Sequence, residues 1–159
     1  PHFIPSWEGY KSEKWHQYPL QVISPHPRWS FHTHYDKHES WLDDIPMHRV
    51  KINGYPYWPC RINPKDAEAR GIKDGDIVEL YNDRGSVLCV ASVTYRVPEG
   101  VMHSYGCSAR YDPIEPGVPG STDRAGCVNL LTASTLLAKN VPGMTPNSLL
   151  VEIRKWEEK

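Results

Sequence analysis

Apolar residues in the middle of the chain form two runs that a short polar segment separates. Residues 77–81 and 86–94 are rich in β-branched and apolar side chains, which favours extended strands. Residues 82–85 between them read Asn-Asp-Arg-Gly. Asn, Asp and Gly tolerate the left-handed backbone conformations of tight turns. The pattern therefore predicts a β-hairpin over residues 77–94.

The residues before this hairpin have the pattern of a short capped helix. Asn63 precedes Pro64, whose ring holds Asn63 extended and itself fits the first helical position. Residues 65–70 are mostly good helix formers, and Gly71 can take the left-handed conformation that ends a helix. We therefore predict a helix of about two turns with Asn63 as its N-cap.

Other apolar runs predict the rest of the strands, at 18–24, 57–62, 101–105 and 148–156, with 47–52 as a further candidate. Residues 128–138 have the pattern of a short helix, whereas 37–59 and 106–126 show no sustained period and predict long loops. Five to seven short strands without a long crossover helix favour a closed barrel over a layered α/β sheet. The sequence therefore predicts a mainly β fold with a few short helices.

The overall charge and the cysteines exclude several classes of function. The 159 residues suit one domain, and 18 basic residues nearly balance 19 acidic ones. Without a basic run we expect no nucleic acid or anionic membrane surface as a partner, and without an apolar run of about 20 residues we expect no membrane span. The four cysteines occur singly, so a structural zinc site or an iron–sulfur cluster is not expected in this chain.

Motifs of known catalytic sites are absent from the sequence. It contains no Walker loop, no G-x-G-x-x-G, no G-x-S-x-G and no H-E-x-x-H. We therefore expect no catalytic residue and no metal ligand in the chain itself.

Residues 24–36, SPHPRWSFHTHYD, concentrate polar side chains in one segment. In and just after it, histidines recur at the even spacings 26, 32, 34 and 38, which would place them on one side of an extended chain. Metal ligation, a solvated or packing role, and contact with an anionic ligand are the three interpretations. No nearby Asp or Glu has the spacing of a recognised metal-ligand set, which argues against the first.

Five other polar residues are candidates for ligand contact, and each also has a structural explanation. Asn63 caps a helix whose free N–H groups could face a diphosphate. Asn82 and Asp83 are turn residues that could instead accept hydrogen bonds from the edge of a guanine base. Asn129 and Thr132 stand three residues apart, as in a helix cap or on one face of a helical turn. Both explanations stay open for all five.

Four segments, in this order, resemble the C-terminal cofactor domain of the dimethyl sulfoxide reductase superfamily. They are SPHPRWSFHTHYD (24–36), INPKDAEARGIKDGDIVELYNDRG (62–85), VPEGVMHSYG (97–106) and GCVNLLT (126–132). Members of this superfamily are large molybdenum and tungsten oxidoreductases that carry molybdopterin guanine dinucleotide. The resemblance covers about residues 18–155, and the most similar subfamily is that of the pyrogallol–phloroglucinol transhydroxylase large subunits. The segment ASTLLAKNVPGMTPNS departs from the Asp-Pro-x-Ser pattern of many members, which leaves the subfamily open.

The resemblance implies a six-stranded double-psi β-barrel over residues 18–159, after an arm, 1–17, that links it to a preceding domain. Such a domain binds molybdopterin guanine dinucleotide, while the metal ligand and the substrate-binding residues lie in earlier domains. The implied substrate is a hydroxylated aromatic compound such as pyrogallol. The expected partners are those earlier domains and an iron–sulfur small subunit. We expect a cytoplasmic location, or a periplasmic one if a preceding segment carries an export signal.

The resemblance also implies roles for particular residues. Arg28, His32 and Thr33 would contact the pterin and the diphosphate, with His34 as a further candidate. A guanidinium binds phosphate oxygens in pairs, and imidazole and hydroxyl groups can donate to phosphate or to pterin heteroatoms. Asn129 would hydrogen-bond the pterin or a phosphate.

Three alternatives remain at this point. The full protein could act on another substrate class of the same superfamily. The chain could be a stand-alone double-psi barrel that binds other proteins, although the polar segment 24–36 is unlike an apolar peptide groove. It could also be a self-cleaving enzyme similar to aspartate α-decarboxylase, which breaks a Gly-Ser bond, but the Gly85-Ser86 pair is already explained by the hairpin turn.

Overall fold

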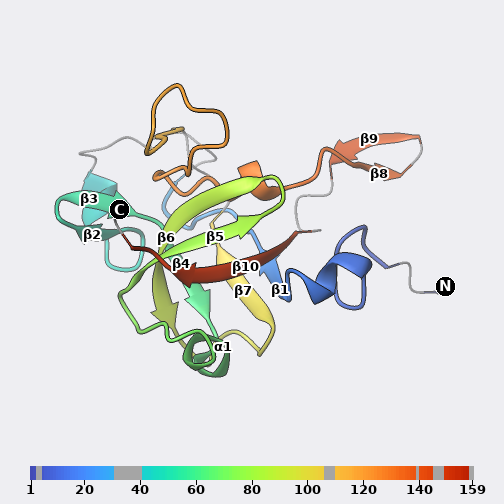
Figure 1. Cartoon of the computed structure of the whole chain (residues 1–159), viewed down its shortest axis with the longest axis horizontal. Coiled ribbons are helices and arrows are strands. Elements are labelled where there is room, and N and C mark those ends of the chain that lie inside the picture. Colours follow the sequence, from blue (N-terminus) through green and yellow to red (C-terminus); the bar gives the residue numbers. More distant parts are fainter. Residues whose placement is uncertain (3–4, 31–40, 106–109, 139, 145–148, 158–159) are drawn as a thin grey trace.

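The computed structural model describes residues 1–2, 5–30, 41–105, 110–138, 140–144 and 149–157 (Figure 1). Writing η for a 3-10 helix, its elements are η1 (Glu13–His16), β1 (Leu20–Ile23), η2 (Trp41–Asp44), β2 (Val50–Ile52), β3 (Tyr55–Tyr57), β4 (Pro59–Ile62), α1 (Pro64–Glu68), β5 (Ile77–Asn82), β6 (Gly85–Val93), β7 (Val101–Ser104), η3 (Val128–Leu131), β8 (Leu136–Ala138), β9 (Val141–Met144) and β10 (Leu150–Lys155). The described chain is therefore mainly β with a few short helices, as predicted.

Six strands close into a barrel in the order β1-β10-β5-β6-β4-β7. Neighbouring strands are antiparallel except for two parallel pairs, β1 with β7 and β4 with β6. The barrel has two equivalent halves, in which β1, β4 and β5 correspond to β6, β7 and β10 in that order. If each strand is exchanged with its counterpart, every strand keeps the same neighbours and the same parallel or antiparallel pairing. This pseudo-twofold connectivity agrees with the double-psi barrel that the family resemblance implies.

Alternate side chains of the barrel strands fill the interior. Cys60 and Ile62 of β4 and Val78 and Leu80 of β5 are fully buried within one cluster. Trp58, just before β4, is also fully buried. Burial of such apolar surface stabilises the barrel by roughly 25 cal/mol for each Å² removed from water.

The helix and the hairpin predicted from local sequence are both confirmed. Asn63 has an extended backbone, and its side-chain oxygen accepts a hydrogen bond from the backbone N–H of Lys65 at 3.1 Å. Gly71 has the left-handed φ of 64° expected at the end of the helix. Strands β5 and β6 pair from Ile77 with Val90 to Asn82 with Gly85.

The helix predicted over residues 128–138 is wrong beyond its first turn. The structure has one 3-10 turn, η3, after which Thr132 is extended. Residues Leu136–Ala138 form β8, which pairs with β9. Strand pairing with a segment farther along the chain, which helical periodicity does not report, decides this conformation.

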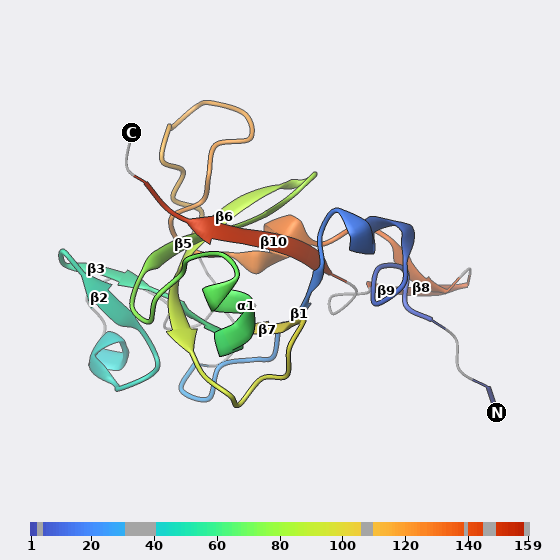
Figure 2. The ribbon, with the colours of Figure 1, turned by 60° about the horizontal axis from the view of Figure 1, so that its bottom comes forward.

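Two hairpins extend from opposite sides of the barrel. Figures 1 and 2 show β2–β3 on one side and β8–β9, next to η1, on the other. The indole N–H of Trp7 donates to the carbonyl of Leu136 at 3.0 Å, so the N-terminal arm contacts the second hairpin. Strand β2 confirms the predicted strand within 47–52. None of the helices in the described ranges has the length and apolar character to span a membrane.

Candidate functional site

The hairpin of β5 and β6, the loop 110–126 and η3 meet around a pocket of about 270 Å³. We call it the hairpin–η3 pocket, and its lining residues are Arg84, Gly85, Ser86, Tyr111, Gly120, Ser121 and Leu130. The structure thereby brings together two predicted groups, Asn82 with Asp83 on the hairpin and Asn129 with Thr132 at η3.

Asn82 joins three parts of this site through its side chain. Its amide nitrogen donates to the carbonyl oxygens of Leu131 at 2.8 Å and Leu150 at 3.1 Å. Its side-chain oxygen accepts from the backbone N–H of Arg84 at 2.9 Å. The residue is buried, so these bonds use both ends of the amide within the chain. Asn82 therefore ties the hairpin to η3 and β10.

Arg84 anchors the N-terminal arm to the hairpin. Its guanidinium donates to both carboxylate oxygens of Glu8, at 2.8 and 2.7 Å, and to the carbonyl of Leu131 at 2.7 Å. Lys14 of the arm binds the exposed Asp83 at 2.7 Å. Burial alone would raise the pKa of Glu8, but the hydrogen bonds and charges of Arg84 and Lys14 outweigh it and lower that pKa.

This arrangement predicts that acid loosens the arm. The pKa of Glu8 is lowered in the folded chain. The ionised Glu8 therefore contributes to the free energy of unfolding above the ordinary glutamate pKa, and this contribution is lost as the pH falls below about 4. Glu8→Gln should lower the free energy of unfolding at neutral pH by about 1–2 kcal/mol. It should also make the decrease of this free energy at acid pH, the acid limb, less steep. Denaturant titrations between about pH 3 and 7 measure this. The control is Glu13→Gln, and an unchanged acid limb in Glu8→Gln would contradict the prediction.

Asp123 organises the loop 110–126, and the sequence reading missed it. Its fully buried carboxylate accepts from the backbone N–H groups of Asp112 at 2.8 Å, Ala125 at 3.1 Å and Cys127 at 2.9 Å. Its own backbone exchanges hydrogen bonds with Ser86 and Leu88 of β6. The available signal was an Asp within a Gly- and Pro-rich segment, because Asp side chains often bind nearby backbone N–H groups.

A second set of contacts holds the same loop against the β2–β3 hairpin. The hydroxyl of Tyr55 donates to Asp112 at 2.7 Å, and Arg124 donates to the same carboxylate oxygen at 3.1 and 3.2 Å. The guanidinium of Arg124 also lies 4.2 Å from the centre of the Tyr55 ring. Burial and the adjacent Asp112 raise the pKa of Tyr55, so this phenol stays protonated and keeps donating at physiological pH.

Asn129 and Thr132 lie at the outer side of the site. The side chain of Asn129 is exposed, while its carbonyl accepts from the backbone N–H of Thr132 at 3.2 Å and from the Thr132 hydroxyl at 2.8 Å. Thr132 thus closes the 3-10 turn that presents Asn129. The Asn129 side chain remains available to a ligand, because within the described ranges it forms no hydrogen bond.

The other predicted residues are not part of this pocket. Asn63 lies at the beginning of α1, which Figure 1 places at the opposite end of the barrel from the loop 110–126. Its side chain is occupied by Lys65 and by the carbonyl of Val97, to which it donates at 2.9 Å. Arg28 is exposed and its guanidinium lies 4.7 Å from the centre of the Trp29 ring. The predicted contacts His32, Thr33 and His34 lie outside the described residues.

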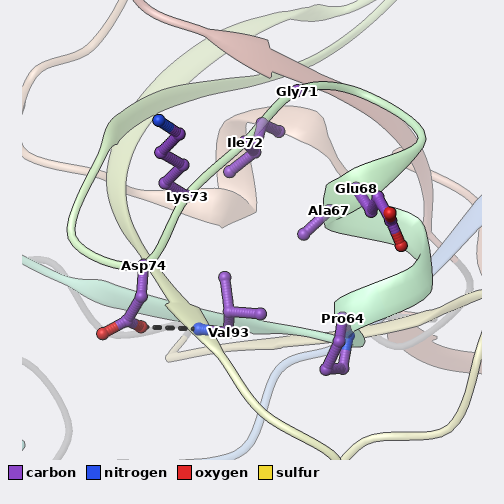
Figure 3. A pocket seen from close by; sticks show the side chains of 8 residues that line it. All are labelled: Pro64, Ala67, Glu68, Gly71, Ile72, Lys73, Asp74 and Val93. Carbon is purple, nitrogen blue, oxygen red and sulfur yellow. Dashed lines mark hydrogen bonds between the residues drawn. The ribbon is translucent and has the colours of Figure 1, made fainter.

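A larger pocket of about 580 Å³ lies beside α1 (Figure 3). Ala67, Ile72 and Val93 point toward one another across it, and the side chain of Asp74 accepts from the backbone N–H of Val93 at 2.8 Å. Its apolar floor continues the barrel core. None of the predicted cofactor contacts that the structure describes lines it.

Comparison with known proteins identifies the domain. Residues 20–142 match the family model described as the molydopterin dinucleotide binding domain. The chain belongs to this family. The chain is therefore a molybdopterin dinucleotide-binding domain, as the four sequence segments predicted.

Relatives of this molybdopterin dinucleotide-binding domain are subunits of much larger size. The chain is 48% identical over 157 residues to the pyrogallol hydroxytransferase large subunit of Pelobacter acidigallici, covering 98% of the chain and 18% of that subunit. It is 34% identical over 140 residues to a dimethyl sulfoxide/trimethylamine N-oxide reductase of Cereibacter sphaeroides, covering 88% of the chain and 16% of the reductase. The chain thus spans less than a fifth of these relatives.

A solved structure shares the fold. Acetylene hydratase from Pelobacter acetylenicus superposes with a TM-score of 0.68 and 17% sequence identity, over 98% of this chain and 21% of that one. At this identity the likeness concerns the fold.

The described residues of the domain fit a dinucleotide cofactor at two places. The hydroxyl oxygen of Ser30, within the segment 24–36, is buried and finds no hydrogen-bond partner among the described residues. In the hairpin–η3 pocket, Gly85 and Gly120 face open space, so a ligand can approach their backbone closely. Tyr111, 58% exposed, offers an aromatic face beside them. The lining of this pocket therefore offers open backbone and an aromatic face, which is the chemistry of a binding surface.

Proposed function

We propose that this chain is the molybdopterin guanine dinucleotide-binding barrel of a large molybdenum or tungsten enzyme that acts on hydroxylated aromatic compounds. The 48% identity to the pyrogallol hydroxytransferase large subunit, over 98% of the chain, carries the proposal. Substrate binding and the metal ligand belong to the remaining domains of the same subunit. An iron–sulfur small subunit is proposed as a further partner.

The barrel's own residues bind and orient the cofactor. When bound, the molybdenum cofactor supplies the redox and oxygen chemistry, and the protein positions it. Arg28, His32, Thr33 and His34 are the proposed contacts in one segment, and Asn129 is the proposed contact at η3. Side-chain hydrogen bonds within the chain already occupy Asn63 and Asn82, so these residues act through the backbone that they hold. Asp83 and Thr132 complete the two turns.

The test is made on the complete polypeptide from the native source. Expected results are a mass several times 18.2 kDa, bound molybdenum or tungsten, release of a guanine nucleotide on acid hydrolysis, and turnover of pyrogallol. An autonomous 18.2 kDa protein without metal would overturn the proposal. Turnover of dimethyl sulfoxide or trimethylamine N-oxide in place of polyphenols would retain the cofactor domain and replace the substrate class, since reductases of those compounds are 34% identical.

Arg28→Ala in the complete enzyme is expected to weaken cofactor retention about tenfold while leaving the melting temperature within about 2 °C. The expected loss is that of one charge-assisted hydrogen bond, and the exposed guanidinium contributes little to folding. Molybdenum content and released nucleotide after gel filtration measure the effect. Arg96→Ala, another exposed arginine, is the matched control. Equal cofactor content in the two variants would remove Arg28 from the site.

A further inference from the structure

Arg61 and His103 are neighbours on the outer face of the barrel. They are directly paired residues of the antiparallel strands β4 and β7, and His103 also pairs with Ile23 at the end of β1. The residues on either side of them, Cys60, Ile62, Met102 and Ser104, are fully buried. Because side chains alternate along a strand, Arg61 and His103 project outward.

The two side chains form a defined polar pair. A terminal nitrogen of Arg61 lies 2.8 Å from Nδ1 of His103. The same nitrogen lies 3.4 Å from Nε2, so the guanidinium lies against the imidazole ring, which in its neutral form keeps one N–H donor. The Tyr105 ring packs edge-on against His103, with 4.9 Å between ring centres, and in a tilted arrangement against the buried Trp58, with 5.5 Å between ring centres, which holds this side of the pair in place.

Arg61 differs from five other arginines of the described ranges in having no carboxylate partner. Five other arginines are paired with acids: Arg49 with Asp43, Arg70 with Glu152, Arg84 with Glu8, Arg124 with Asp112 and Arg154 with Glu79. Across the described ranges, no acidic side chain contacts Arg61. Burial and the charge of Arg61 lower the pKa of His103, so at neutral pH the pair carries one positive charge and several free N–H donors.

We propose that Arg61 and His103 form an oxyanion-binding site. The chemistry fits a diphosphate or a carboxylate, because the guanidinium and an imidazole N–H are donors that no acidic side chain of the described residues contacts. Strand β1 ends at Ile23 beside His103, so the chain leaves the barrel at this point, next to the site. If the bound anion is the diphosphate of the dinucleotide cofactor, this proposal rests on the proposed function. If it is the carboxylate of an acidic side chain elsewhere in the complete protein, it does not.

Binding of an anion here is coupled to protonation of His103. The groups that face this imidazole among the described residues are Arg61 from β4, Tyr105 after β7 and Ile23 from β1. An anion offsets the charge of Arg61 and favours the imidazolium, so it raises the pKa of His103. Affinity should therefore increase as the pH falls through the titration of this residue.

The experiment follows the His103 ring by NMR in the full 159-residue chain, with sodium pyrophosphate, sodium acetate or sodium chloride at equal ionic strength. We expect pyrophosphate to raise the His103 midpoint by about one pH unit in a saturable manner. Arg61→Gln should abolish that change, and Arg96→Gln, which removes an exposed charge elsewhere, should retain it. Circular dichroism verifies that both variants keep the barrel.

The results distinguish a diphosphate from a carboxylate as the bound anion, and they also show whether the site exists. Pyrophosphate binding about tenfold tighter than acetate supports the dinucleotide as the source, and comparable binding supports a carboxylate of the complete protein. No saturable change beyond sodium chloride, or the same change in Arg61→Gln as in the unmodified chain, overturns the proposal. Absence of both molybdenum and tungsten from the native protein would refute the proposed function and leave this titration interpretable.

Discussion

Replacing Asp123 by alanine is expected to lower the free energy of unfolding by about 3–5 kcal/mol. The change removes a fully buried carboxylate that accepts three backbone N–H bonds, from Asp112, Ala125 and Cys127. Each buried N–H left without an acceptor costs about 1–3 kcal/mol. The loop 110–126 should separate from β6, which urea denaturation and hydrogen exchange of these three amides would measure.

Two further variants serve as controls for the loss of stability expected in Asp123→Ala. Glu115→Ala changes an exposed acid in the same loop and should alter stability by less than about 0.5 kcal/mol. Asp123→Asn keeps the shape and one acceptor oxygen, so an intermediate loss is expected. A loss below about 1 kcal/mol in Asp123→Ala would show that the loop does not depend on this carboxylate.

Asn82→Ala is expected to destabilise the domain by about 3 kcal/mol. Its amide serves two carbonyls, of Leu131 and Leu150, and one backbone N–H, of Arg84. The truncation removes a donor from each carbonyl, of which only that of Leu131 also accepts from Arg84, leaves the Arg84 N–H without this acceptor, and opens space at a buried position. Asn82→Asp should be at least as damaging, because a carboxylate would face two carbonyl oxygens and has no N–H to donate. Chemical denaturation of each variant measures the loss.

Asp83 next to it is the matched control. Its side chain is 47% exposed and its pairing with Lys14 is a surface ion pair, worth at most about 1 kcal/mol. Asp83→Ala should therefore be nearly neutral. Equal losses at the two positions would contradict the assignment of Asn82 as the residue that joins the hairpin, η3 and β10.

The two buried residues explain how the barrel can present a rigid binding surface. Asn82 holds η3, and Asp123 holds Asp112, next to Tyr111, and Cys127, just before η3. The exposed side chains of Asn129 and Tyr111 are thereby positioned without themselves being part of the core. Restricting contact groups before binding reduces the entropy lost when a ligand is bound.

Neighbouring residues were enough to predict the helix and the hairpin. Asn63, Pro64 and Gly71 determine where α1 begins and ends, because capping and backbone preference act within a few residues. The same local reasoning failed at Leu136–Ala138, where pairing with β9 replaced the expected helix. Family resemblance, through four short segments, added the cofactor and the barrel topology.

The sequence by itself determined the six barrel strands and α1 of this protein, its lack of catalytic motifs and its membership of a cofactor-binding family. Only the tertiary structure decided which strands pair, that Asn82 reaches Leu131 and Leu150, and that Arg61 lies beside His103 without an acid. The physical reason is that strands pair through backbone hydrogen bonds, which are the same for every side chain. Closing the barrel therefore selects partners 40 to 70 residues apart that no local pattern specifies.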